Sequence, residues 1–448
     1  MTTIARQLLL FLAVFFSTSV YAQDGEQPNR VLFTNVNVFD GVNDSLTLNT
    51  SVLVENNLIA AVGPSITLPE GTEVIDGGGR TLMPGLIDAH AHVTIVSTPN
   101  QVANDWHWGY LSAIVSQEAE KMLLRGFTTI RDAGGPAYGI ARAIDDGIIP
   151  GPRIFPSGHF IGQTSGHTDF RSFNESHTQD RSSRSAFETH WAFMADGRDQ
   201  VLAYTRETLR RGATQIKISV GGGVASAYDP LDTTQYTIDE IRAAVEAAEA
   251  WGTYVMVHAY TDKSVMNALE AGVKSIDHGT LIQNDETMAA IKESGAVLNP
   301  QALIFSPTDE ELAALPPAIS AKMAPIIDGL DISMKLAKKH GLKIAFGVDS
   351  FGSIDALAKQ SLELSARLRW FTPSEILVQA TSNTAELLAM SGLRNPYQEG
   401  PVGVIKAGAY ADILLVDGNP MEDLQLLVDH DTGIDLIMKD GKIYKNNL

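Results

Sequence analysis

The sequence predicts an α/β fold: a (β/α)8 TIM-like barrel with a small composite β-sandwich domain from both chain ends. Short apolar runs of strand length recur eight times over about 300 residues. Helical stretches with capping signals separate most of these runs, as a barrel requires. Hairpin-like patterns at the two chain ends contain too few strands to bury a face separately, so we expect them to pair with each other.

The first 22 residues are predicted to be a signal peptide. Arg6 is the only charge in this segment, residues 8–16 are uninterrupted apolar residues, and Val20 and Ala22 lie at the −3 and −1 positions of a cleavage site. The apolar run is too short for a membrane-spanning helix, which needs about 20 residues. We therefore expect an exported protein, periplasmic or secreted, with no membrane contact after cleavage.

Residues 23–82 are predicted to form the N-terminal part of the β domain. Two strand-like runs, 52–54 and 58–62, flank Glu55-Asn56-Asn57. Asparagine tolerates positive φ, so this tripeptide is a plausible hairpin turn.

Residues 83–397 are predicted to form the barrel. The clearest helix spans 238–251, with Thr237 as N-cap, Glu240 completing a capping box and Gly252 at its end. Another spans 263–271 and stops at Gly272. The eight candidate strands are Leu86-Ile87, Phe127 to Ile130, Ile154-Phe155, Gln215 to Val220, Tyr254 to Val257, Lys274 to Ile276, Ala296 to Leu298 and Lys343 to Val348. This alternation fits a barrel better than a Rossmann sheet.

Residues 398–448 are predicted to complete the β domain. An apolar run covers 412–416, and the runs 434–438 and 442–444 flank the turn dipeptide Asp440-Gly441.

Composition excludes several classes of site. The formal net charge is −20, from 33 basic and 53 acidic side chains, which argues against nucleic acid and anionic membranes as partners. Cysteine is absent, which excludes disulfides, thiolate zinc sites, cysteine nucleophiles and iron–sulfur clusters. Any metal must be held by His, Asp, Glu or a less usual ligand.

Polar side chains that can bind metal occur where predicted barrel strands end. The candidates are His90, His92, Lys217, His258, His278 and Asp349. His90 and His92 have the i, i+2 spacing that points both rings the same way from a strand. Lys217 lies among apolar neighbours, where a lysine is costly unless neutralised or paired. It is either a lysine whose amine reaches solvent or one modified to a carbamate. Each candidate alone is compatible with a satisfied core polar group, but their joint placement at the active face of a barrel favours a metal site.

These motifs resemble the metal-dependent amidohydrolase superfamily, in its binuclear form with a carboxylated lysine. The resemblance rests on the strand that ends in His90-Ala91-His92 and on Ile216-Lys217-Ile218, His258-Ala259-Tyr260 and Ser275-Ile276-Asp277-His278-Gly279. It extends to the returning segment 408–413 and so covers nearly the whole chain after residue 22. The motifs are similar to the imidazolonepropionase-like and Xaa-Pro dipeptidase-like branch, which includes ochratoxin-hydrolysing amidohydrolases.

The resemblance implies that His90, His92 and Asp349 hold one divalent ion. His258 and His278 would hold a second, bridged to the first by the carbamate of Lys217. The resemblance gives catalytic roles to Asp349, Lys217 and His278. Two dications lower the pKa of a bridging water, and the resulting hydroxide attacks the substrate while Asp349 carries the proton to the leaving amine. Zn²⁺ is the expected metal, although Mn²⁺, Co²⁺ and Ni²⁺ suit the same ligands.

Two further residues are predicted to contact substrate. His167 follows the third strand, and Tyr228 resembles the position where peptidase-like members meet the substrate α-carboxylate. The alternative is a solvated loop histidine and a solvent-facing turn tyrosine. The connection 160–196, about 35 residues long, is expected to form a lid or pocket wall.

We therefore expect a small-molecule hydrolase that cleaves an amide or peptide bond beside a free carboxylate, with dipeptides or N-acyl amino acids as substrates. The alternative is a lactonase, phosphotriesterase-like enzyme or cyclic-amide hydrolase with the same metal centre. A non-catalytic ligand-binding barrel is the third hypothesis. We also expect a homo-oligomer, because similar enzymes assemble into one.

Overall fold

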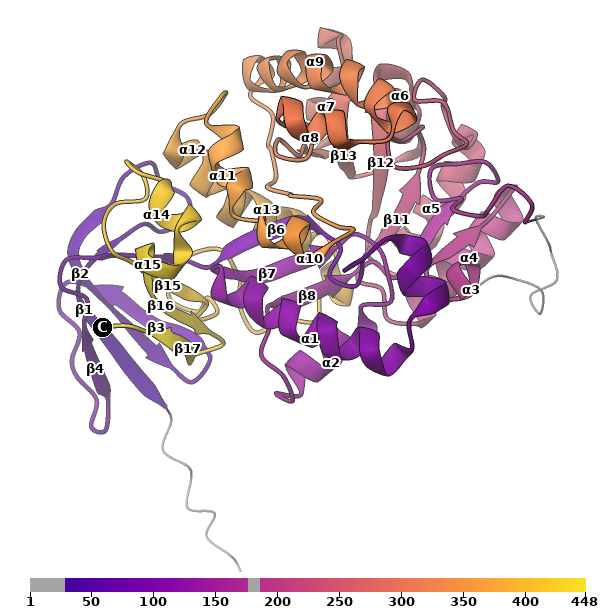
Figure 1. The fold of residues 1–448 in the computed structure, drawn as a ribbon. Helices are drawn as coiled ribbons and strands as arrows, with labels where there is room; N and C mark the ends of the chain where they lie inside the picture. Colours follow the sequence, from indigo (N-terminus) through magenta and orange to yellow (C-terminus); the bar gives the residue numbers. More distant parts are fainter. Residues whose placement is uncertain (1–28, 176–185) are drawn as a thin grey trace, which may run out of the picture.

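The structure is a computed structural model that describes residues 29–175 and 186–448. The predicted signal peptide therefore lies outside the described residues. The chain forms a β domain, which contains the C-terminus, beside a larger α/β domain (Figure 1). No helix in the described ranges is both long enough and apolar enough to cross a membrane.

The β domain is one sheet shared by the two ends of the chain. Its order is β17-β16-β15-β5-β1-β2-β3, with β4 paired to β1. β15 pairs antiparallel with β5, and this pairing joins the two ends and confirms the predicted composite domain. The strands are β1 (Arg30–Val38), β2 (Thr47–Glu55), β3 (Leu58–Gly63), β4 (Glu73–Asp76), β5 (Thr81–Pro84), β15 (Ile413–Val416), β16 (Ile434–Lys439) and β17 (Lys442–Asn446).

Both predicted hairpin turns are present. Glu55 pairs with Leu58 across a turn in which Asn56 has φ of 56°. Asp440 and Gly441 both have positive φ, 56° and 71°, as a two-residue type I′ turn requires.

The barrel strands run in the predicted order, and all but the last have regular strand geometry. They are β6 (Leu86–Ala91), β7 (Phe127–Asp132), β8 (Arg153–Pro156) continued by β9 (Phe160–Gly162), β11 (Ile216–Ser219), β12 (Val255–Thr261), β13 (Ser275–Leu281) and β14 (Val297–Asn299), with β10 (Ala192–Met194) added beside β9. The eighth position is the irregular segment 343–349. Its Ala345 N donates to Leu298 O on β14, and its Phe346 O accepts from Ala89 N on β6, so the barrel closes.

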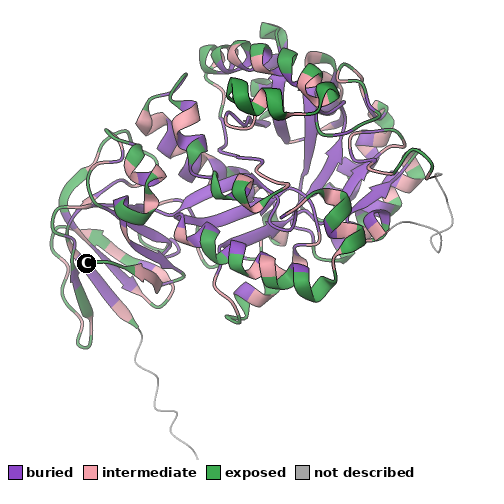
Figure 2. Cartoon of the chain, in the orientation of Figure 1, coloured by how far each residue is buried: buried purple, intermediate pink, exposed green. Residues whose placement is uncertain are grey.

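Helices cover the barrel, and their outward faces are exposed while the strands are buried (Figure 2). The capping box of Thr237 and Glu240 is present at the start of α5, and Gly272 ends α6 with φ of 100°. The α-helices are α1 (Trp108–Leu124), α2 (Tyr138–Asp145), α3 (Ala186–His190), α4 (Arg198–Arg210), α5 (Ile238–Ala250), α6 (Asp262–Ala271), α7 (Asp285–Ser294), α8 (Asp309–Ala314), α9 (Pro317–His340), α10 (Ile354–Ala358), α11 (Leu362–Arg367), α12 (Pro373–Val378), α13 (Thr384–Ala389), α14 (Gln425–Val428) and α15 (His430–Gly433).

A buried arginine links the two domains. Arg153 on β8 donates to Asp412, just before β15, through Nε at 3.0 Å, and to Asp440 through Nη2 at 2.5 Å. The side chains of Arg153 and Asp412 are 4% and 2% exposed, whereas Asp440 is 45% exposed. The guanidinium also lies over the Tyr410 ring, 3.8 Å from its centroid.

Asp412→Asn should therefore lower the free energy of unfolding by roughly 3–5 kcal/mol, because it leaves a buried guanidinium without its buried counter-charge. Asp440→Asn is the matched control. It removes a half-exposed partner of the same arginine and should cost below about 1 kcal/mol. Urea denaturation of both variants measures the difference. Equal losses would contradict the assignment of the domain link to Asp412.

Candidate active site

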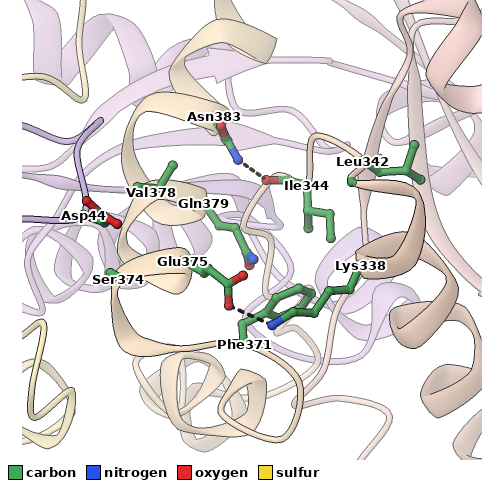
Figure 3. Close-up of a pocket in the computed structure, with 11 residues that line it drawn as sticks. Asp44, Lys338, Leu342, Ile344, Phe371, Ser374, Glu375, Val378, Gln379 and Asn383 are labelled. Carbon is green, nitrogen blue, oxygen red and sulfur yellow. Dashed lines mark hydrogen bonds and ion pairs between the residues drawn. The ribbon is translucent and has the colours of Figure 1, made fainter.

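A cavity of about 760 Å³ opens at the C-terminal ends of the barrel strands. All six candidate metal ligands line it: His90, His92, Lys217, His258, His278 and Asp349. A smaller cavity of about 240 Å³ lies elsewhere, beside α9 and α12 (Figure 3). Two of its three charged residues, Lys338 and Glu375, form an ion pair at 3.0 Å, and the third is Asp44. The larger cavity is therefore the candidate active site.

Three of the candidates converge closely. Asp349 Oδ1 lies 3.2 Å from His92 Nε2 and 3.5 Å from His90 Nε2. One ligand atom from each residue lies within 4.8 Å of the other two, which is a spacing that a single ion can bridge.

Hydrogen bonds to the opposite ring nitrogens fix the orientation of these histidines. His90 Nδ1 lies 3.2 Å from Asp277 Oδ1, and His92 Nδ1 lies 3.1 Å from Gly134 O. Each bond leaves Nε2 directed at Asp349. His258 has the reverse arrangement, because its Nε2 donates to Gly222 O at 3.0 Å and Nδ1 is left for the site. Such second contacts select the tautomer that a metal ligand needs.

The His278 ring lies close to the rings of both His258 and His90. Its ring centroid is 4.6 Å from that of His258 and 5.0 Å from that of His90. His278 Nδ1 is buried without a hydrogen-bond partner in the described structure, and it lies 3.9 Å from Asp349 Oδ2. His278 and Asp349 both have positive φ, 75° and 58°, which costs energy for residues other than glycine and is typical of functional sites.

Burial favours the neutral form of the nitrogen ligands. It holds the pKa of His90, His258 and His278 well below 6.5. Burial also lowers the pKa of Lys217 to about 8, against the opposing effect of Asp277 and Asp349. A lysine amine must be neutral to react with CO₂, so a larger reactive fraction is present near neutral pH than for an exposed lysine.

The two predicted substrate contacts have different positions. His167 lines the cavity, and its ring stacks on His258 with centroids 3.9 Å apart and planes inclined by 17°. Tyr228 is 46% exposed and does not belong to the cavity wall, so the structure does not bring it to the site. The tyrosine at the site is Tyr260, whose ring centroid is 4.6 Å from that of His258.

The predicted long connection after the third strand does contribute to the cavity. Its wall residues are Phe160, His167, Thr168, Phe170 and Phe187. The described part of this connection therefore forms part of the pocket wall.

Sequence reasoning missed the residues that support the ligands. Asp277, which holds His90, also accepts a hydrogen bond from the buried Arg131 at 2.8 Å and another from Asn299. Tyr260 is two residues after His258 on β12, so strand alternation could have indicated it. Asp277 directly precedes His278, and strand alternation would have placed it on the other face. Arg131 carried no such signal, because its partner Asp277 is 146 residues away.

Most other histidines lie outside the site. Those described are His107, His159, His190, His340 and His430, and His177 falls outside the described residues. His159 is a buried core residue whose ring stacks on Phe193 with centroids 4.2 Å apart.

His159 should make the protein less stable at acid pH. Burial lowers its pKa to about 4 in the folded state, against 6.5 for an unperturbed side chain. Its stabilising contribution is thus complete above about pH 6.5 and is lost as the pH falls towards 4. The unfolding free energy of His159→Gln should fall about 2 kcal/mol less than that of the parent between about pH 7.5 and about pH 5. Urea denaturation at both pH values checks this, and equal slopes would contradict it.

The donor set fits divalent metal ions. It offers imidazole nitrogens, a carboxylate and a lysine amine, without thiolate, and the buried His278 Nδ1 has no protein partner among the described residues. The barrel and the donor cluster together define the class: a (β/α)8-barrel protein with a candidate metal site at the C-terminal face of the barrel.

The chain belongs to the amidohydrolase family, which residues 81–444 match. A prolidase crystallised with N-methylphosphonate-L-proline is 34% identical, and the match covers 93% of this chain and 100% of that one with a TM-score of 0.85. Ochratoxinase from Aspergillus niger is 27% identical over 421 residues, 89% of this chain and 83% of the relative. Its crystal structure gives a TM-score of 0.81 over 94% of this chain and 96% of its own.

Imidazolonepropionase from Deinococcus radiodurans is 26% identical over 404 residues, 84% of this chain and 87% of the relative. These matches confirm the predicted family and barrel fold. They also confirm that the protein is a hydrolase acting on C–N bonds.

Proposed function

We propose that this amidohydrolase cleaves an amide or peptide bond next to a free carboxylate, as a carboxypeptidase or dipeptidase does. The observation that carries the proposal is the convergence of the six candidate ligands on one cavity. Two relatives support an amide or peptide bond as the target. They are named prolidase and ochratoxinase, and both match this chain over most of its length.

In this proposal His90, His92 and Asp349 would hold one divalent ion, His258 and His278 would hold a second, and Lys217, as a carbamate, would be a further ligand. When bound, the ions would lower the pKa of an attacking water and polarise the scissile carbonyl. Zn²⁺ is our proposed metal, since imidazole and carboxylate ligands suit it.

The chain's own residues supply proton transfer and orientation. Asp349 is placed to take the proton of the attacking water, because its carboxylate faces His90, His92 and His278 together. The same carboxylate then returns the proton to the leaving amine. Tyr260 stays protonated, since burial raises its pKa well above 10, and it remains a hydrogen-bond donor beside the site.

The remaining cavity wall favours substrates with a bulky apolar part. The wall includes the rings of Phe160, Phe170, Phe187 and Phe351. It also includes Ile304, Phe305, Ile319 and Met323. The cavity has room for a drug-sized ligand. We therefore propose N-acyl amino acids of the ochratoxin type, with a large aromatic or apolar acyl group, alongside apolar dipeptides.

Incubation of the zinc-loaded protein with N-acyl amino acids and dipeptides tests the proposal through amine release. Each substrate is paired with its C-terminal amide, which removes the free carboxylate. Faster turnover of the free acids supports the proposal. No amine release from any member would overturn it, and faster hydrolysis of matched lactones or phosphotriesters would favour the alternative chemistry. We also propose that the protein is exported and forms a homo-oligomer. Expression with residues 1–22 in an exporting host, followed by N-terminal sequencing, tests the export, and a mass measurement of the purified protein in solution tests the oligomer.

A further inference from the structure

The loop between β11 and α5 holds two histidine rings of the site. Gly222 O accepts the hydrogen bond from His258 Nε2 at 3.0 Å, and Ser226 Oγ lies 2.8 Å from His167 Nδ1. His167 N also donates to Gln235 Oε1 at 2.9 Å. Because the two rings stack, the path of this one loop sets the position of both.

A lysine from another helix fixes this loop. Lys322 on α9 donates from Nζ to the carbonyl oxygens of Gly223, Ser226 and Asp229, at 2.9, 2.8 and 2.7 Å. An ammonium group has three N–H donors, and the three backbone contacts use all of them. The Asp229 carboxylate lies 3.6 Å from the same nitrogen and is 1% exposed.

The backbone of the loop packs closely against its neighbours at two glycines. A Cβ at Gly223 would lie 1.8 Å from His167 Nδ1, and a Cβ at Gly222 would lie 2.0 Å from Pro230 O. Asp229 Oδ2 accepts from both Gly223 N, at 2.8 Å, and Gln235 Nε2, at 3.1 Å. A displacement of the loop backbone therefore moves the histidine rings with it.

Helix α9 also belongs to the cavity wall through Ile319 and Met323, which flank Lys322 in the sequence. We propose that Lys322 is a positioning residue of the metal centre: it clamps the loop 222–229 to α9 and so holds His258 and His167 in place. Lys322 is not a metal ligand itself. It links helix α9, which carries the wall residues Ile319 and Met323, to the loop that contacts His258 and His167. This inference rests on the metal ligands of the proposed function, and its test uses metal ions alone.

Metal-free protein is titrated with Zn²⁺ against a chromophoric chelator, for the parent, Lys322→Met, Lys322→Gln and Lys335→Met. Lys335 is the matched control, since it lies on the same helix, is 69% exposed and pairs with Asp331. Lys322→Met should weaken one of the two Zn²⁺ affinities about 10–100-fold and leave the other unchanged. Lys322→Gln keeps two N–H donors and should lose less. The visible spectrum of the Co²⁺-loaded protein should change in Lys322→Met and not in Lys335→Met.

Unchanged affinities and spectrum in a folded Lys322→Met protein would overturn the proposal, as would an equal loss in Lys335→Met. If Lys322→Met fails to fold, the Zn²⁺ affinities of Lys322→Gln are compared with those of the parent. If neither folds, Lys322 serves the stability of the fold and the positioning role is refuted. Because no substrate is used, failure of the amide panel leaves this result intact.

Discussion

Lys217→Ala should lower turnover about 10³-fold or more and reduce the bound metal from two ions to one or none per chain. In the proposed centre the carbamate would be a ligand of both ions, so its loss would remove a contact from each. The buried site would also lose an anion that offsets the repulsion between two dications. Metal analysis after gel filtration and steady-state kinetics on the best amide substrate measure both effects.

Two controls isolate the carbamate from the lysine itself. Acetate or propionate added to Lys217→Ala should restore part of the metal binding and activity, because a short carboxylate fits the vacated position and presents two oxygens. Parent protein stripped of metal and reloaded in CO₂-free buffer should bind Zn²⁺ poorly until bicarbonate is added. Full activity and two bound ions in Lys217→Ala would refute the bridge.

Short-range patterns in the sequence predicted much of the fold. The capping box at Thr237, the turn at Asp440-Gly441 and the glycine end of α6 each depend on residues within a few positions, and the structure contains all three. The placement of the candidate ligands followed from strand ends, since a barrel brings these ends to one face.

Other features depend on contacts between distant residues. The eighth barrel position is held by hydrogen bonds to β6 and β14 without regular strand geometry, which no local pattern reports. Tyr228, the predicted substrate contact, lies exposed outside the cavity wall, on a loop that is bonded to Lys322 about a hundred residues later in the sequence. Arg131 and Asp277 likewise form a pair that only the folded chain brings together.

Asp349→Asn should lower kcat about 10³–10⁴-fold even at saturating Zn²⁺. Asparagine has nearly the same shape and keeps one oxygen for the contact with His92 Nε2, at 3.2 Å in the parent. It cannot accept the proton of the attacking water or return it to the leaving amine. Because Asp349 is itself a proposed ligand, loss of its negative charge should also weaken Zn²⁺ binding, so the kinetics are measured at several metal concentrations.

The metal dependence of kcat separates the two roles of Asp349. Loss of a general base should keep the kcat of Asp349→Asn low at saturating Zn²⁺, whereas loss of a ligand alone would restore parental kcat once the metal is saturating. Asp355→Asn, an isosteric change at an exposed position at the start of α10, should leave both metal binding and kcat unchanged. Recovery of parental kcat by Asp349→Asn at high Zn²⁺ would contradict the proton-transfer role and leave Asp349 as a ligand only. Because Asp349 Oδ1 already faces two imidazoles and Oδ2 faces a third, we expect the carboxylate to serve both roles at once.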